Sequence, residues 1–202
     1  MQKTAFITGI ALVASILTIF VFLTGITSLS ELKGGRERKL NVMPIALQNK
    51  RSGEASLKML TDFHGYNFTL KKIHEAGEPE VHGHSSLWMA DMRRSLRHLG
   101  VSYGWKDDFA DARSFIEFAK KKIMAGQPVL TGFKIYPNEH PEWANDYFGV
   151  IFGVDDGGFH FHSTIAAVPT QYRTFEALSS AEHGLSFYNV QGYYFALTLS
   201  DQ

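Results

Sequence analysis

A change in hydrophobic periodicity near Gly126 restricts the folds that this chain can adopt. Before that glycine, apolar residues recur at helical spacing, and after it they alternate with polar residues as in β-strands. The sequence Val-Asp-Asp-Gly-Gly at residues 154–158 predicts a hairpin turn. Helices followed by antiparallel strands predict an α+β fold. We expect helices at residues 54–63, 85–99 and 111–125, and strands at residues 128–135, 147–155, 159–164 and 188–199.

Polar residues and glycines mark the expected ends of the helices. Ser85 and Ser86 are candidate N-terminal caps of the second helix, because a hydroxyl side chain can accept a hydrogen bond from a free backbone N–H. Gly65, Gly100 and Gly126 follow the expected last turns, where the chain often adopts a left-handed conformation that suits glycine. These residues predict where the second helix begins and where each of the three helices ends.

A long uncharged segment precedes these elements. Residues Thr4 to Ile26 contain no charged side chain, and a helix of that length, at about 1.5 Å per residue, can cross the roughly 30 Å hydrocarbon core of a bilayer. A cleaved secretory signal is the alternative, since such signals also begin after a basic residue such as Lys3. Their apolar region is shorter, about 7–15 residues, and residues 23–31 match a cleavage site poorly. We therefore expect an uncleaved transmembrane helix within residues 1–28.

The remainder of the chain divides into a linker and one domain. Residues 29–42 are polar, charged and contain a Gly-Gly pair, which is typical of a juxtamembrane linker. Residues 43–202 carry all the periodic segments and show no internal repeat. They form the expected soluble domain.

Two features of the sequence predict opposite orientations of the anchor. Lys33, Arg36, Arg38 and Lys39 follow the uncharged segment and Lys3 precedes it, so a strict count of positive residues places the domain in the cytoplasm. Short N-terminal anchors with a brief charged head nevertheless often act as export signals. We expect a single-pass membrane protein whose domain is extracytoplasmic, in the periplasm or on the cell surface.

Composition excludes several classes of function. Lys plus Arg and Asp plus Glu number 20 each, and both signs are dispersed, so no basic stripe indicates a nucleic-acid partner. The chain contains 0 cysteines, which excludes disulfides, thiolate metal sites and thiol nucleophiles. Hydrophobic residues make up 45%, enough for a folded core.

Three sequence blocks follow one another in an informative order. The first is QNKRSGEASLKMLTDFHG at residues 48–65, the second comprises LRHLG at 96–100 and MAGQPVLTGF at 124–133, and the third is YFGVIFGVDDGGFHFHST at 147–164. Together they resemble the papain-like cysteine peptidases, specifically the branch that processes bacteriocin precursors with double-glycine leader peptides. The likeness covers most of residues 44–165. It implies a papain-like fold, in which a helical half packs on an antiparallel sheet.

The resemblance also implies the positions of a catalytic site. The family's oxyanion-donating Gln corresponds to Gln48, its nucleophilic Cys to Ser52, its catalytic His to Tyr147, and its orienting Asp to Ser163. A serine hydroxyl depends on an adjacent base, and a tyrosine with a pKa near 10 is protonated at neutral pH and cannot act as that base. We therefore expect a catalytically inactive domain whose cleft binds a peptide or partner protein.

Two alternatives remain open. His160 and His162 lie on the same face of their expected strand, and His162, with Asp146 or Asp155 behind it, could serve Ser52 as the base of an active hydrolase. Gln48 would then complete an oxyanion hole. The third possibility is a structural envelope protein whose cleft is filled by its own side chains.

A metal or cofactor is not expected. The histidines of the first half, His64, His74, His82 and His84, have no cysteine partners and no HExxH spacing, so they are a weak zinc signal. We therefore expect these histidines to be loop residues near the start of a helix.

Overall fold

The computed structural model describes residues 37–45, 51–134, 147–164, 169–179 and 194–200. The expected transmembrane helix lies outside these ranges. Among the residues that are described, no helix has the length and apolar character needed to cross a bilayer. From Glu37 onward, the described residues belong to one compact unit.

The helices lie mainly in the first half of this unit. Asp111 caps α5 by accepting a hydrogen bond from the backbone N–H of Ser114 at 2.7 Å, and Thr69 caps α3 by accepting one from the N–H of Lys72 at 3.1 Å. The helices are α2 (Ser52–Phe63), α3 (Leu70–Gly77), α4 (Met89–His98), α5 (Ala112–Met124) and α6 (Phe175–Ser179), and a 3-10 turn covers Pro79–His82.

The strands form one seven-stranded sheet in which every described pairing is antiparallel. The strand order is β2-β7-β3-β4-β5-β6, and β1 pairs with the end of β4. The short β1 lies within residues 29–42, the expected linker. The strands are β1 (Arg38–Lys39), β2 (Tyr103–Lys106), β3 (Val129–Phe133), β4 (Tyr147–Val154), β5 (Gly158–Ser163), β6 (Thr170–Thr174) and β7 (Ala196–Leu199).

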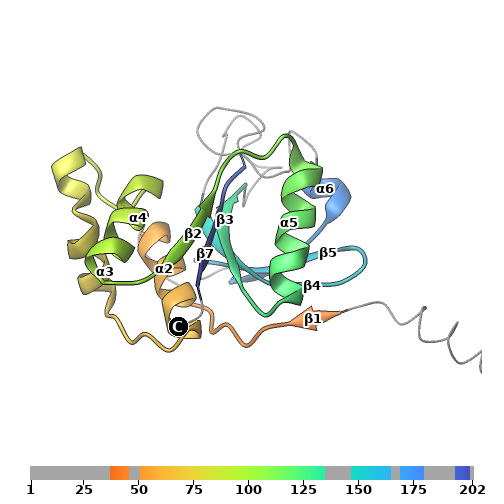
Figure 1. Ribbon diagram of the computed structural model, residues 1–202, viewed down its shortest axis with the longest axis horizontal. Coiled ribbons are helices and arrows are strands. Elements are labelled where there is room, and N and C mark those ends of the chain that lie inside the picture. The colour runs from red at the N-terminus through yellow and green to blue at the C-terminus, as the bar shows by residue number, and fades with distance from the viewer. Residues whose placement is uncertain (1–36, 46–50, 135–146, 165–168, 180–193, 201–202) are drawn as a thin grey trace, which may run out of the picture. The chain divides into compact units, whose positions relative to one another are not determined.

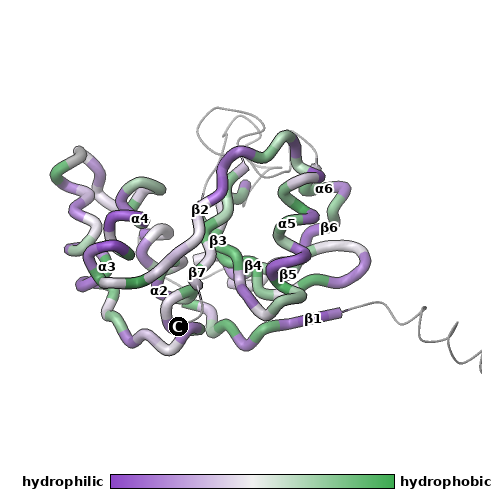
Figure 2. Tube along the Cα trace, viewed as in Figure 1, coloured by the Kyte–Doolittle hydropathy of each residue, from purple (hydrophilic) through white to green (hydrophobic). Residues whose placement is uncertain are grey.

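Two hydrophobic clusters cover the two faces of the sheet. On one face, α2 packs over alternate residues of β4 such as Phe148 and Val150, and α3 and α4 pack against α2; on the other, α5 packs over residues such as Ile151 and Phe161, and α6 packs against α5 and β6 (Figure 1). The apolar residues concentrate on central strands such as β3 and β4, whereas β1 is hydrophilic (Figure 2). We call these faces the α2 face and the α5 face.

The α+β class, with helices packed on an antiparallel sheet, is confirmed. The expected second helix is shorter than its sequence suggests: α4 begins at Met89, and the Asp91 carboxylate accepts the N–H of Trp88 at 3.0 Å. The proposed caps Ser85 and Ser86 are therefore wrong: the N-cap residue is Trp88, whose side chain makes no cap hydrogen bond, and Asp91 reaches back to its backbone N–H. The sequence interpretation missed α3, β2 and β6, and much of the expected last strand, residues 180–193, lies outside the described residues.

Candidate functional site

Ser52, at the expected nucleophile position, is the first residue of α2. Its side chain is half-buried, and its hydroxyl makes no hydrogen bond with any other described residue. The next residue, Gly53, packs so tightly that a Cβ there would lie 2.1 Å from the carbonyl oxygen of Leu87. This contact positions the start of α2 against the loop that precedes α4. Gln48, the expected oxyanion donor, lies outside the described residues.

Tyr147 and Ser163, at the expected base and orienting positions, lie near each other. Tyr147 begins β4, and Gly149 two residues later is the cross-strand partner of Ser163 at the end of β5. Side chains two residues apart share a face of a strand, so Tyr147 and Ser163 are diagonal neighbours on the α5 face. Tyr147 is half-buried and packs against the cluster on that face, and Ser163 is fully buried.

His162, the base of the alternative hydrolase, lies on the α2 face and is buried. Its Nε2 lies 2.9 Å from the carbonyl oxygen of Val42 and its Nδ1 lies 2.9 Å from the hydroxyl of Thr170. A carbonyl can only accept, so Nε2 donates and Nδ1 accepts from the Thr170 hydroxyl in the neutral ring. The ring also stacks on Phe152, with centroids 4.0 Å apart. Both nitrogens are thus engaged by residues other than Ser52.

The surroundings of His162 favour its neutral form. Burial lowers the pKa of His162, and the hydrogen bonds to the carbonyls of Val42 and Pro169 offset that effect only in part. Through its two hydrogen bonds, the neutral imidazole connects the segment after β1 to the β5–β6 edge of the sheet. The hydrogen bonds that are observed for His162 therefore connect parts of the described fold, and its role as a base stays a prediction.

Asp155, one of the two carboxylates considered as its partner, is used elsewhere. It begins the turn between β4 and β5 and accepts the N–H of Gly157 at 2.8 Å, the N–H of Gly158 at 2.9 Å and the hydroxyl of Tyr172 at 2.9 Å. Burial raises the pKa of Asp155, but these bonds outweigh it and hold the pKa below its usual value. Its second oxygen lies 3.6 Å from Nε2 of His160. The other candidate, Asp146, lies outside the described residues.

A carboxylate–imidazole–carboxylate group includes the buried Glu54, two residues after Ser52, and the exposed Glu80. Nδ1 of His74 lies 2.6 Å from Glu54 and its Nε2 lies 2.5 Å from Glu80, so both ring nitrogens face carboxylate oxygens. Burial lowers the pKa of His74, but its hydrogen bonds to the two glutamates and their negative charges outweigh burial and raise the pKa above the usual value. A protonated ring donates both bonds, and it neutralises Glu54, which is fully buried.

Sequence reasoning missed this group, although a signal was available. Glu54 lies one and two helical turns before Leu57 and Thr61, which are buried on the same side of α2. An acidic residue in that position requires a partner, because an isolated buried charge is costly. His74 was expected in a loop; the structure places it in α3, where it is that partner.

His84 is also bonded to a carboxylate. Its Nδ1 lies 2.8 Å from the buried Asp91, which also bonds Arg94 at 3.0 Å, and its ring stacks on Trp88 at 5.0 Å. These contacts tie the loop before α4 to the first turn of that helix. No three His, Asp or Glu side chains in the described ranges are arranged as ligands of a metal ion.

Comparisons with known proteins give the fold a precedent. Neither a protein-family model nor a curated protein sequence matches the chain. The peptidase domain of Streptococcus ComA, a bifunctional ABC transporter involved in a quorum-sensing pathway, matches with a TM-score of 0.56 and 12% identity, covering 80% of this chain and 100% of that one. A Bacillus anthracis protein described as a C39-like peptidase matches with a TM-score of 0.60 and 15% identity, covering 83% and 98%.

At these identities the comparisons establish the fold alone. The chain has the α+β fold of C39-like peptidase domains, which confirms the resemblance to double-glycine leader peptidases at the level of architecture. The absence of cysteine from the sequence fits a substituted nucleophile position. The described structure therefore has the fold of a peptidase domain, and His162 and Asp155 form hydrogen bonds with other residues of that fold.

Proposed function

We propose that this chain is a membrane-anchored, non-catalytic C39-like domain that binds a peptide or a partner protein in the cleft between its helical and sheet halves. The observation that carries the proposal is the state of the site: the chain has 0 cysteines, and His162, the base of the alternative hydrolase, is hydrogen-bonded to Val42 and Thr170. A serine hydroxyl without a base is a poor nucleophile at neutral pH.

Binding without chemistry has a physical basis in this fold. An extended peptide can pair its backbone with exposed strand-like backbone, and side-chain pockets then select its sequence. The loss of proton transfer at Ser52 leaves that recognition unaffected, because it depends on backbone groups and cleft shape. The likeness to a transporter-linked peptidase domain is analogy, and it suggests a peptide rather than a small molecule as the ligand.

A serine-directed fluorophosphonate probe tests the absence of catalysis. Incubated with the full-length chain, the probe is expected to label it no more than it labels a Ser52→Ala variant, because no base activates the hydroxyl. An active serine hydrolase added to the same sample serves as the positive control. Labelling that disappears in Ser52→Ala would support the alternative function, an active hydrolase with Ser52 as nucleophile and His162 and Gln48 in supporting roles.

Photo-cross-linking tests the binding of a peptide or protein. Full-length chains carrying p-benzoylphenylalanine at position 52 are expected to form defined adducts in their native membrane under ultraviolet light, identified by mass spectrometry. The same residue at position 121, an exposed lysine on α5, is the control. Equal adducts at both positions, or none at position 52, would contradict a binding cleft at the start of α2.

Extraction of membranes tests the anchor. The full-length chain is expected to stay in the membrane pellet after alkaline carbonate treatment, because residues 4–26 can span the hydrocarbon core. A chain beginning at Glu37, where the compact unit starts, is expected in the supernatant. Protease added to cells whose outer membrane, where they have one, has been permeabilised is expected to degrade an extracytoplasmic domain. Release of the full-length chain by carbonate would rule out a spanning helix.

A further inference from the structure

A hollow lies on the α5 face of the sheet, outside the candidate site. Helix α5 packs on β3, β4 and β1, so the outer strands β7 and β2 extend beyond its cover. The hollow encloses about 200 Å³. Its floor and walls are formed by Gly104 and Lys106 of β2, Ala196 and Thr198 of β7, and Phe118 and Lys122 of α5.

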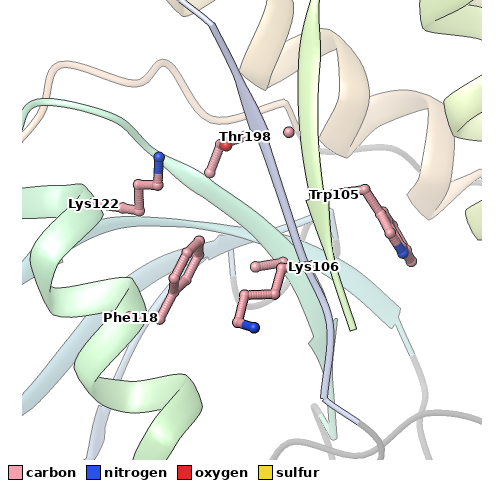
Figure 3. Close-up of a pocket in the computed structure, with 7 residues that line it drawn as sticks. Trp105, Lys106, Phe118, Lys122 and Thr198 are labelled. Carbon is pink, nitrogen blue, oxygen red and sulfur yellow. The ribbon is translucent and has the colours of Figure 1, made fainter. Parts of the chain in front are cut away.

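Small residues on adjacent strands create this space. Gly104 is the cross-strand partner of Thr198, and Lys106 is the partner of Ala196, so all four side-chain positions share the α5 face. Phe118 and Lys122 face Thr198 and Lys106 across the hollow, whereas the ring of Trp105 lies on the opposite side of β2 (Figure 3). Gly104, Ala196 and Thr198 have small side chains and leave empty space between the longer side chains at the rim.

The rim carries more positive than negative charge. Lys122 donates a hydrogen bond to the neutral amide of Gln127 at 2.9 Å, and Lys106 is paired with the carboxylate of Asp108. That pairing holds the pKa of Asp108 below its usual value, through the hydrogen bond from Lys106 and its positive charge. Two ammonium groups thus line the hollow, and the carboxylate paired with one of them, that of Asp108, is 80% exposed. A second carboxylate in the hollow would complete the charge balance.

One wall of the hollow is apolar. The ring of Phe118 lies beneath the ammonium of Lys122, 5.6 Å from its centroid, and meets the ring of Phe109 edge-on at 5.3 Å. The buried Thr198 supplies a hydroxyl at the floor, 3.1 Å from where a Cβ on Gly104 would lie. An apolar body resting on Phe118 can therefore direct a polar group toward Lys122, Lys106 and this hydroxyl.

We propose that this hollow binds a carboxylate carried on a small apolar body, held by Lys106 and Lys122 against the ring of Phe118. Its volume is below the roughly 300–1,000 Å³ of sites that enclose a whole drug-sized ligand, so it accommodates one acid group and its immediate support. Such a group is found in free aromatic acids and in the glutamate side chains of peptides.

Calorimetry with benzoate tests the proposal on the full-length chain in detergent micelles, with protein-free micelles as the blank. Benzoate is expected to bind, and neutral benzamide, which has nearly the same shape, is expected not to bind. Lys106→Gln and Lys122→Gln are each expected to weaken benzoate binding about fivefold, the effect of one partly exposed charge pair. Lys121→Gln, which removes an exposed lysine from the same helix, is expected to leave the affinity unchanged.

Asp108→Asn provides a gain-of-function arm. Removing this carboxylate frees the ammonium of Lys106, and benzoate is expected to bind about twofold more tightly. Equal binding of benzoate and benzamide, or benzoate binding that is unaffected in both lysine variants, would overturn the proposal. So would the absence of benzoate binding to both the wild-type and Asp108→Asn proteins.

The source of the carboxylate is resolved by a second ligand. A blocked tripeptide with a central glutamate is compared with its glutamine counterpart under the same conditions. Binding of the glutamate peptide that is weakened by Lys122→Gln supports the site and assigns it to acidic side chains of peptides. Binding of benzoate alone supports the site and assigns it to free acids.

Discussion

Replacing His74 with leucine is expected to destabilise the protein by about 3–5 kcal/mol, the cost of leaving one member of a buried ion pair without its partner. Glu54 is fully buried, and its Oε2 has no hydrogen-bond partner among the described residues, so its charge depends on the ring of His74. Urea unfolding followed by tryptophan fluorescence measures the effect. A loss below about 1 kcal/mol would show that the contact between Glu54 and His74 contributes little to stability.

A double variant separates the loss of charge pairing from the loss of packing. In Glu54→Leu/His74→Leu both partners are apolar, and the protein is expected to regain much of the stability lost in His74→Leu, since apolar replacements of buried ion pairs are often neutral. A double variant as unstable as His74→Leu would attribute the defect to packing. Glu80 is exposed and remains hydrated in both variants.

The same group predicts a pH dependence with a defined sign. The folded-state pKa of His74 is raised above the usual value near 6.5, so its contribution to stability is fully present below about pH 6.5 and is lost as pH rises through the folded-state pKa. The difference in unfolding free energy between wild type and His74→Leu is therefore expected to shrink from pH 6 to pH 9. A difference that grows over this interval would contradict a charged His74.

The second large effect is expected at Gly158, the first residue of β5. A Cβ there would lie 2.1 Å from the carbonyl oxygen of Arg173 and 2.9 Å from the Cα of Thr174, both backbone atoms of the paired strand β6. Gly158→Ala must therefore separate β5 from β6, and we expect a loss of about 3 kcal/mol or more in the unfolding free energy.

The neighbouring Gly157 offers a matched control for that variant. Its nearest obstacle is the hydroxyl of Tyr172 at 2.8 Å, the end of a side chain that can move. Gly157→Ala is therefore expected to cost much less than Gly158→Ala in the same urea titration. Equal losses in the two variants would indicate that the turn, rather than the contact between strands, limits the substitution.

The parts of the fold with strong local patterns could be predicted from the sequence. Helix α5 has apolar residues on one face and an aspartate cap, and β4 has a long apolar run, so both were recognised close to their observed ends. Strand β6, Thr-Gln-Tyr-Arg-Thr, is short and polar. It pairs with β5 along its length, and its own residues do not predict this pairing.

The candidate site divides in the same way. The positions of Ser52, Tyr147 and Ser163 are implied by the resemblance of the sequence blocks to double-glycine leader peptidases, and the roles assigned to them remain predictions. The environment of His162 could not be predicted, because its carbonyl partner Val42 is 120 residues away in the sequence. That contact requires β1 to pair with the end of β4, which is a property of the assembled sheet.

The position of β7 bears on how this domain is synthesised. Residues 196–199 pair with β2 along their length and meet β3 at Leu130, so these two strands are bridged by a segment that follows both of them in the sequence. A nascent chain emerging from the ribosome holds β2 and β3 unjoined until translation passes Leu199. The pairing of these strands can therefore be completed only after residues 196–199 have been synthesised, and premature termination before residue 196 leaves two open sheet edges exposed to aggregation.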